Sequence, residues 1–334
     1  MPRPPTLNDE EIMHDPAPPM RREVFRMTDD DARAFLRAAP FVHLAGCAAG
    51  RPVLKTVNVV ELDGAWWFHG AVAGEKTAML GGPVVLAAEE LVAQLPSTFV
   101  DEERACFASA LYRSVQLHGA LERVDDPADK ARALHALMVR FQPEGGFRAI
   151  THDDPVYAGE VKGVLVARVV PLRIDGKAKL AQNKQPHEVR ALLERLWRRG
   201  DPGDARAVAL IAAANPTVEA PGFLQGPPGA RLCCALEPAH LDAAVALHDQ
   251  AAAGAAAPEV VRRRLLASLA WVGAVDHTGA LIGSAHRYLD RATGALACHI
   301  AVAPTLRAGP LADALARLLA DHPAVRGDRG PAPA

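Results

Sequence analysis

The segment His69-Gly70-Ala71-Val72-Ala73-Gly74-Glu75-Lys76 decides how the first half of this 334-residue chain is interpreted. It follows the apolar run Ala65-Trp66-Trp67-Phe68 and precedes a predicted helix around Thr77–Leu80. Small residues let a backbone approach a ligand closely, and a lysine beside free N–H groups at a helix start suits a phosphate. The segment is therefore either a phosphate-binding turn or an ordinary turn between a strand and a helix.

The residues around this segment alternate between short strands and helices. Asp63-Gly64, between two apolar runs, is a strong β-hairpin signal, and Thr28 before a cluster of aspartates is typical of a helix start. We expect a β-rich α+β domain over residues 26–214, after a tail over residues 1–25. Its predicted strands are residues 41–47, 52–61, 65–69, 84–88, 114–124 and 161–174, and its predicted helices are residues 28–38, 126–141, 186–199 and 205–214.

The character of the sequence changes after a Pro- and Gly-rich linker over residues 215–230. We expect a second domain over residues 231–327 and a short tail over residues 328–334. No repeat relates the two halves of the chain. The second domain should contain strands at residues 232–236, 270–276, 281–289 and 295–302, and helices at residues 238–250, 258–269 and 311–320.

Composition argues against several classes of partner. The formal net charge of -2 gives no electrostatic case for nucleic acid or an anionic membrane as the main partner. No apolar stretch reaches the roughly 18 residues that a transmembrane helix needs. The N-terminus is Pro-rich and lacks the apolar core of a secretory signal. We therefore expect a cytoplasmic protein.

Cysteine and histidine usage agrees with that expectation. The chain has five cysteines, an odd number, and no Cys-x-x-Cys pair, which favours a reduced setting over a disulfide scaffold. Cys47, at the end of a predicted strand, is expected to be a small core residue. His118, His135 and His152 lack the spacing of metal ligands, so no metal site is expected.

Four sequence elements occur in order: Pro52–Asn58, His69–Lys76, Tyr112–Gly119 and Gly176–Lys184. Together they resemble the FMN-binding split-barrel superfamily, the pyridoxamine 5′-phosphate oxidase-like proteins, and look closest to its nitroimidazole-resistance-type branch. The fourth element is similar to the Lys-x-x-Gln-Asn element of related split-barrel proteins. The resemblance covers residues 22–212, and four elements in the right order are more specific than any one alone.

The resemblance implies a six-stranded split barrel that forms a homodimer and binds FMN at the dimer interface. Lys76 and the turn before it would hold the FMN phosphate, the strand from Lys55 would run beside the isoalloxazine, and His69 would be the catalytic group. Arg113 and Ser114 would lie at the phosphate or subunit side, and a later loop would close the site. The implied cofactor-binding residues are Lys55, Thr56, Val57, Asn58, His69, Gly70, Ala71, Gly74, Lys76, Arg113, Ser114, Lys179, Gln182 and Asn183.

Several of these residues also have a plainer interpretation. Lys55 could be a solvated residue on one face of a strand, and Arg113 could be a structural ion-pair partner. His69 could be hydrogen-bonded at a strand end rather than carry a proton near the flavin. Trp66 and Trp67 point to opposite faces of their strand, so at least one of them is expected in the core.

Three elements of the second domain resemble the GNAT acetyltransferase fold: Trp271–Val275, Leu281–Ala285 and Val302–Ala312. That family cradles the acetyl-CoA pyrophosphate with backbone N–H groups of an Arg-x-x-Gly-x-Gly/Ala loop. Here Pro310 replaces the central glycine and has no N–H to donate, although Gly309 could compensate in part. The strand that normally follows the last helix is expected to be missing. We therefore expect a truncated, degenerate GNAT-like α/β module that does not acetylate and does not use acetyl-CoA.

The leading functional hypothesis is an FMN-dependent oxidoreductase acting on a small organic substrate, since the flavin carries the redox chemistry in such proteins. One alternative is a non-catalytic, regulatory protein that binds a flavin or another small ligand. A second alternative is a GNAT N-acetyltransferase that uses acetyl-CoA and carries the flavin fold as an accessory domain. A deazaflavin or haem could take the place of FMN, because split barrels accommodate several such ligands.

Overall fold

The computed structural model describes residues 20–251, 257–290 and 293–326. The chain divides into two compact units. The first takes in the residues up to Glu90 together with Tyr112–Lys179, and the second takes in Leu91–Leu111 and the chain from Leu180 onward. This division differs from the domains expected from the sequence over residues 180–214, which the sequence assigns to the first domain and the structure assigns to the second unit. Of the predicted tails, residues 1–19 and 328–334 lie outside the described residues.

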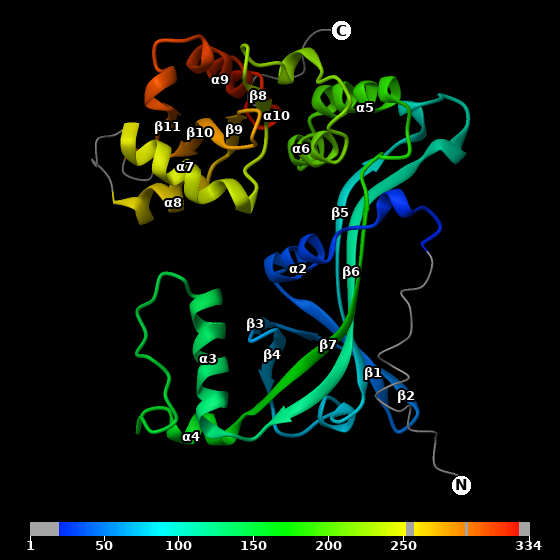
Figure 1. Cartoon of the computed structure of the whole chain (residues 1–334), viewed down its shortest axis with the longest axis vertical. Helices are drawn as coiled ribbons and strands as arrows, with labels where there is room; N and C mark the ends of the chain where they lie inside the picture. Colours follow the sequence, from blue (N-terminus) through cyan, green and yellow to red (C-terminus); the bar gives the residue numbers. More distant parts are fainter. Residues whose placement is uncertain (1–19, 252–256, 291–292, 327–334) are drawn as a thin grey trace. The chain divides into compact units, whose positions relative to one another are not determined.

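The first unit is built on a seven-stranded sheet with the strand order β2-β1-β5-β6-β7-β4-β3 (Figure 1). Strands β1 and β2, β6 and β7, and β3 and β4 pair antiparallel, and so do β4 and β7. The sheet has one strand more than the six that the resemblance implies. The strands are β1 (Val42–Ala48), β2 (Arg51–Val57), β3 (Val60–Leu62), β4 (Ala65–Gly70), β5 (Pro83–Leu95), β6 (Ser109–Val124) and β7 (Leu165–Lys179).

Two of the predicted strands are divided or shortened. The strand predicted over residues 52–61 is two strands, β2 and β3, and the Asn58 side chain between them donates to the Pro40 carbonyl oxygen at 2.8 Å. The strand predicted over residues 161–174 begins later, since the short helix α4 (Ala158–Gly163) occupies its first residues. The predicted hairpin at Asp63-Gly64 is confirmed. Both residues have positive φ, 51° and 76°, as a two-residue type I′ turn requires.

Side chains from most strands of the sheet share one core. Val57 of β2, Leu44 of β1, Phe68 of β4 and Leu117 of β6 all belong to this buried cluster. Strands β2 and β4 lie near opposite edges of the sheet, and in a flat sheet their side chains could not meet in one cluster. The sheet therefore curls around its core, as a split barrel does.

The two tryptophans of β4 lie on opposite faces of the sheet, as alternation predicts. Trp66 belongs to the barrel core, and Trp67 packs in a second cluster with Ala133 of helix α3 (Pro127–Phe141). The Trp67 indole N–H donates to the Leu62 carbonyl oxygen at 3.0 Å. Both rings are buried, so β4 is covered on both faces.

Helix α2 (Asp29–Ala38) covers part of the barrel. It begins where predicted, because the Thr28 side chain accepts a hydrogen bond from the Asp31 N–H, and Leu36 packs in the core. The prediction of a buried Cys47 is wrong, since this residue is exposed. Val42 and Leu44 of β1 point inward, and alternation therefore turns Cys47 outward.

The second unit joins a helical hairpin to a four-stranded sheet of order β11-β10-β9-β8. The Trp197 indole N–H donates to the Asp321 carboxylate at 2.7 Å and fixes the hairpin to the module. The hairpin is α5 (Pro186–Arg199) and α6 (Asp204–Ala214); the module contains β8 (Arg231–Cys233), α7 (Pro238–Ala251), α8 (Pro258–Leu266), β9 (Ala270–Val275), β10 (Leu281–Leu289), β11 (Leu296–Val302), α9 (Leu311–Ala320) and α10 (Pro323–Arg326). The 3-10 turns of the described residues are η1 (Glu23–Phe25), η2 (Thr77–Met79), η3 (Ser97–Phe99), η4 (Ala105–Phe107), η5 (Gly222–Leu224) and η6 (Pro304–Leu306).

Candidate functional site

The segment from His69 to Lys76 links strand β4 to the 3-10 turn η2. The helix expected after Lys76 is a 3-10 turn of three residues, which is too short to provide the N-terminus of an α-helix. Directly after η2 the chain returns to the sheet, because the Gly81 N–H donates to the carbonyl oxygen of Leu121 in β6 at 2.8 Å. Any phosphate site here must therefore rest on the turn itself and on Lys76, without a helix N-terminus.

The turn carries a run of backbone N–H groups that the protein does not use. Within the described chain, the N–H groups of residues 71–76 donate no hydrogen bond, whereas those of Thr77 and Ala78 donate to the carbonyl oxygens of Gly74 and Glu75. Residues 71–75 are exposed. Consecutive unpaired N–H groups in a turn form a concavity that suits an anion.

Lys76 supplies a positive charge at the end of this run. Its ammonium makes no ion pair or hydrogen bond with any residue that the structure describes. The side chain folds back over Gly70, where an added Cβ would lie 2.5 Å from the Lys76 Nζ. Gly70 therefore leaves room for the lysine, and a larger residue there would displace the ammonium.

His69 lies beside this lysine at the end of β4. The imidazole reaches solvent, and no hydrogen bond holds it to the described part of the chain, so the interpretation as a bonded strand-end histidine finds no support. Partial burial, and then the positive charge of Lys76, lower the pKa of His69 below its ordinary value. At neutral pH the ring is uncharged and can accept a proton.

Strand β2 brings its alternate side chains to this turn. The Lys55 ammonium forms an ion pair with the Glu75 carboxylate, and this pairing lowers the pKa of Glu75. Val57, on the same face as Lys55, is buried in the core, whereas Thr56 and Asn58 are exposed on the other face. Since β2 is the end strand of the sheet, its outer backbone edge has no strand partner among the described residues. Lys55 thus contacts the turn through Glu75, a residue that the sequence motif did not single out.

The other predicted site residues lie away from the turn. Strand β7 pairs with Gly70 at Leu165 and with Tyr112 at Lys179. These two ends of β7 are roughly 45 Å apart along the strand, at ~3.3 Å per residue. A single chain therefore does not bring the residues near Lys179 to the turn.

Arg113 has the structural role that its plainer interpretation describes. Its guanidinium forms an ion pair with Glu90 at 2.7 Å and lies 4.9 Å from the centre of the Phe35 ring. Ser114 of β6 pairs with Lys177 of β7 in the sheet. Arg113 is thus already neutralised within its own chain.

Gln182 and Asn183 follow β7 in the second unit. The Gln182 side chain accepts a hydrogen bond from the Leu180 N–H at 2.7 Å, whereas Asn183 is exposed. The resemblance places both in a loop that closes the site, and that role stays a prediction.

The described residues contain neither a candidate metal-binding group nor a helix suited to span a membrane. No group of three His, Cys, Asp or Glu side chains there is arranged to hold a metal ion. His118 instead lies 3.2 Å from the Arg173 guanidinium and 3.5 Å from the Asp175 carboxylate. None of the described helices is long and apolar enough to cross a membrane.

The predicted acetyl-CoA loop precedes helix α9. Pro310 is the N-cap residue of this helix, and the Gly309 N–H donates to the Leu306 carbonyl oxygen at 3.1 Å. Gly309 therefore has no free N–H with which to replace the one that proline lacks. The resemblance of the second unit to acetyltransferases stays a prediction.

The curled antiparallel sheet and its anion-suited turn fit the split-barrel class, and comparison with known families agrees. Residues 28–178 match the family described as pyridoxamine 5'-phosphate oxidase. The match supports a pyridoxamine 5'-phosphate oxidase-like domain in the first unit. No curated protein matches the chain.

Several solved structures are partly similar to the chain. The flavocytochrome Anf3 from Azotobacter vinelandii is 23% identical, with 46% of this chain and 69% of that chain covered and a TM-score of 0.39. The FAD and heme binding protein from Mycobacterium smegmatis is 21% identical, with 46% and 71% covered and a TM-score of 0.38. The FAD binding protein from the same organism is 18% identical, with 46% and 97% covered and a TM-score of 0.30.

Proposed function

We propose that the first unit binds FMN and that the protein is an FMN-dependent oxidoreductase acting on a small organic substrate. One observation carries the proposal: the Lys76 ammonium lies over Gly70 at the end of a run of N–H groups, and neither it nor they have a partner in the part of the chain that the structure describes. The family match over residues 28–178 supports it. A phosphate monoester needs a cation and several N–H donors, and this turn offers a lysine and a run of N–H groups without partners in the described chain.

The surroundings of the turn also suit the rest of the cofactor. The outer backbone edge of β2 offers donors and acceptors to the polar rim of an isoalloxazine. Val72 in the turn and Leu54 on β2 are apolar and are 51% and 63% exposed. Apolar side chains beside a few placed polar groups are the usual lining of a cofactor site. Lys55 and Glu75 neutralise each other, whereas Lys76, which has no ion pair among the described residues, keeps its charge for the phosphate.

When bound, the flavin would supply the transfer of electrons or hydride. The chain's own residues would bind and orient. Lys76 and the N–H groups of residues 71–76 would offset the phosphate charge, and Glu75 would keep Lys55 aligned along β2. His69, uncharged at neutral pH, would accept a proton from the substrate at its unprotonated ring nitrogen.

A homodimer would complete the site. The residues near Lys179 lie at the far end of β7 from the turn, so a second copy is the source that could bring them to it. Arg113 would then act mainly through its ion pair with Glu90, which fixes the strand that faces the partner.

Titration of the purified chain with FMN, followed by flavin fluorescence, tests the proposal. Lys76→Ala is expected to weaken FMN affinity by about 5- to 150-fold, the equivalent of about 1–3 kcal/mol for a charge-assisted bond. Lys162→Ala is the matched control, because Lys162 is exposed on α4 and its side chain has no partner among the described residues. The control should bind FMN like the unaltered chain.

Three outcomes would change the assignment. A colourless chain that takes up no added FMN would remove the flavin function, and the spectrum of any copurifying chromophore would distinguish a deazaflavin or haem. Flavin binding without reduction by NAD(P)H, with or without an added acceptor, would favour the non-catalytic binding protein. Saturable calorimetric binding of acetyl-CoA would favour the acetyltransferase. It would also contradict the expectation that the loop cannot bind this cofactor because the Gly309 N–H is already used in a hydrogen bond.

A further inference from the structure

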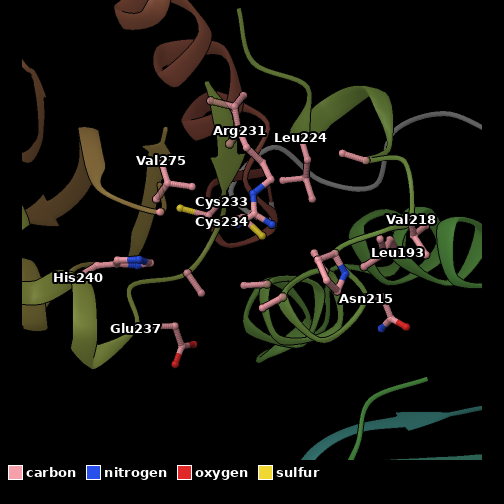
Figure 2. Close-up of a pocket in the computed structure, with 18 of the residues that line it drawn as sticks. Leu193, Asn215, Val218, Leu224, Arg231, Cys233, Cys234, Glu237, His240 and Val275 are labelled. Carbon is pink, nitrogen blue, oxygen red and sulfur yellow. The ribbon is translucent and has the colours of Figure 1, made fainter. Parts of the chain in front are cut away.

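The second unit contains a cavity of about 490 Å³ that the flavin proposal does not use. Helices α5 and α6, the loop after α6, strand β8 and the start of α7 line it. Figure 2 shows Leu193 and Val218 on one side and Val275 and His240 on the other. The volume falls within the range of small-molecule sites, roughly 300–1,000 Å³.

The cavity walls are fixed to one another by direct bonds. The Cys234 thiol lies 3.1 Å from the Ala205 carbonyl oxygen and ties the end of β8 to α6. The buried Asn215 amide donates to the carbonyl oxygens of Leu180 and Ile211 at 2.9 and 2.7 Å, which holds the loop against α6. A cavity with walls held in this way is formed before a ligand arrives, which lowers the cost of binding.

Most of the lining is apolar, and the buried amide of the polar lining residue Asn215 is already used in hydrogen bonds to the chain. Arg231 of β8 and His240 of α7 make no side-chain hydrogen bond or ion pair within the described chain. Arg231 is exposed, and the His240 ring points toward the cavity (Figure 2). Leu193, Val218 and other aliphatic side chains also line the cavity.

The charges favour an anion over a cation. Glu237 also lines the cavity, but its carboxylate Oε1 lies 3.9 Å from the Arg206 guanidinium, which offsets its charge. Arg231 is left as an uncompensated positive charge. Since a guanidinium binds carboxylates well, the polar end of a ligand is expected to be a carboxylate.

The cavity thiols point to binding rather than to chemistry. Burial raises the pKa of Cys233 to about 12 and raises the pKa of Cys234 as well. Only the thiolate is a nucleophile, so neither cysteine attacks a ligand near neutral pH.

We propose that this cavity binds an amphiphilic monocarboxylate, with the carboxylate at Arg231 and His240 and the apolar part between Leu193, Val218 and Leu224. A straight-chain fatty acid and an aryl acid share this chemistry. The proposal is independent of flavin binding, because every lining residue belongs to the second unit.

Isothermal titration calorimetry on the full chain tests it with sodium octanoate, sodium 4-phenylbutyrate and octylammonium chloride. At least one of the two carboxylates is expected to bind saturably at one site, and their relative affinities show whether a chain or a ring fits better. Octylammonium should bind at least tenfold more weakly, because its charge opposes that of Arg231. Arg231→Gln is expected to weaken carboxylate binding by about tenfold or more.

Arg195→Gln is the matched control, because Arg195 is an exposed arginine of α5 outside the cavity. It should bind carboxylates like the unaltered chain. Both variants change exposed side chains, so both should keep the melting temperature. The proposal is wrong if neither carboxylate binds saturably, if octylammonium binds as tightly, or if Arg231→Gln and Arg195→Gln bind alike.

Discussion

His286 of strand β10 is buried in the second unit with 1% of its surface exposed, and neither of its ring nitrogens has a hydrogen-bond partner in the structure. Its ring lies 4.6 Å from that of His248, 5.3 Å from that of Tyr288 and 5.7 Å from that of His299. Burial lowers the pKa of His286 to about 3 and that of His248 to about 4, and the neighbouring histidines and Arg264 add to the effect on His286. Both rings are therefore uncharged in the folded protein.

The stability of the second unit should fall as the pH drops below about 6.5. In the unfolded chain these imidazoles take up protons near their ordinary pKa, whereas in the folded chain they do not until about pH 4 or 3. The unfolded state binds more protons in that window, so acid favours it, by up to about 1.4 kcal/mol per pH unit for each imidazole. Urea denaturation between pH 7.5 and pH 5, monitored by fluorescence, measures the slope.

His286→Leu separates this effect from the titration of carboxylates. No hydrogen bond is lost, so its unfolding free energy at pH 7.5 should stay within about 1.5 kcal/mol of the unaltered chain, and its slope should be shallower. His277→Leu, at an exposed turn, should keep the original slope. Equal slopes in all three proteins would show that His286 is not the source.

Helix α5 and strand β7 show what local sequence can and cannot specify. The predicted limits of α5 are confirmed, because Pro186, the capping box of Gln185 with Glu188, and Gly200 at φ 71° mark its two ends. Val161 is β-branched and was expected in a strand, yet it is buried in α4. Strand preference depends on the surroundings, which a single sequence window does not contain.

The candidate site follows the same division. The His69–Lys76 turn and the alternation of Trp66 and Trp67 could be read from neighbouring residues. The ion pair of Lys55 with Glu75 could not, since it depends on how the sheet curls. The sequence also could not predict that Arg231 has no ion-pair partner among the described residues, because that depends on which distant segments pack beside it.

Strands β6 and β7 also predict the effect of a glycine substitution. The pairing shifts by one residue between His118 and Gly119, and a Cβ on Gly119 would clash with the Val170 carbonyl oxygen and the Val169 side chain. Backbone cannot yield as a flexible side chain can, so Gly119→Ala should lower the unfolding free energy by about 1–3 kcal/mol. Thermal or urea denaturation measures it.

Gly159→Ala is the matched control in the same unit. Gly159 lies in α4, and an added Cβ there would have no atom within 4 Å. Alanine favours helix, so this variant should be unchanged or more stable by up to about 1 kcal/mol. Similar losses in both variants would contradict the steric argument.

At the scale of the whole molecule, the two halves of the predicted cofactor site lie at opposite ends of β7. On the predicted site, a twofold-symmetric pair of chains would bring one half from each chain together at each of two sites. The exposed Leu54 on the end strand β2 is the kind of apolar contact that a partner covers. The homodimer expected from the sequence stays a prediction.

Sedimentation velocity should show a particle of twice the 35.4 kDa chain mass. Leu54→Lys should shift the particle toward the single-chain mass and weaken FMN binding, because a charge would be buried in the interface. Leu289→Lys, an equivalent change at a 53% exposed leucine of the second unit, should leave the mass unchanged. A single-chain particle that binds FMN tightly would rule out a shared site.

The hairpin tip Leu91–Leu111 belongs to the second unit although its sequence lies within the first half of the chain. The Arg199 guanidinium donates to the Gln94 carbonyl oxygen and lies 5.2 Å from the centre of the Phe99 ring, across 105 residues of sequence. At about 5–20 residues per second, roughly 5–20 s of synthesis separate the tip from the arginine that secures it. During that interval Phe99 lacks its contact with Arg199 of α5, so the tip of the nascent chain is open to aggregation and proteolysis.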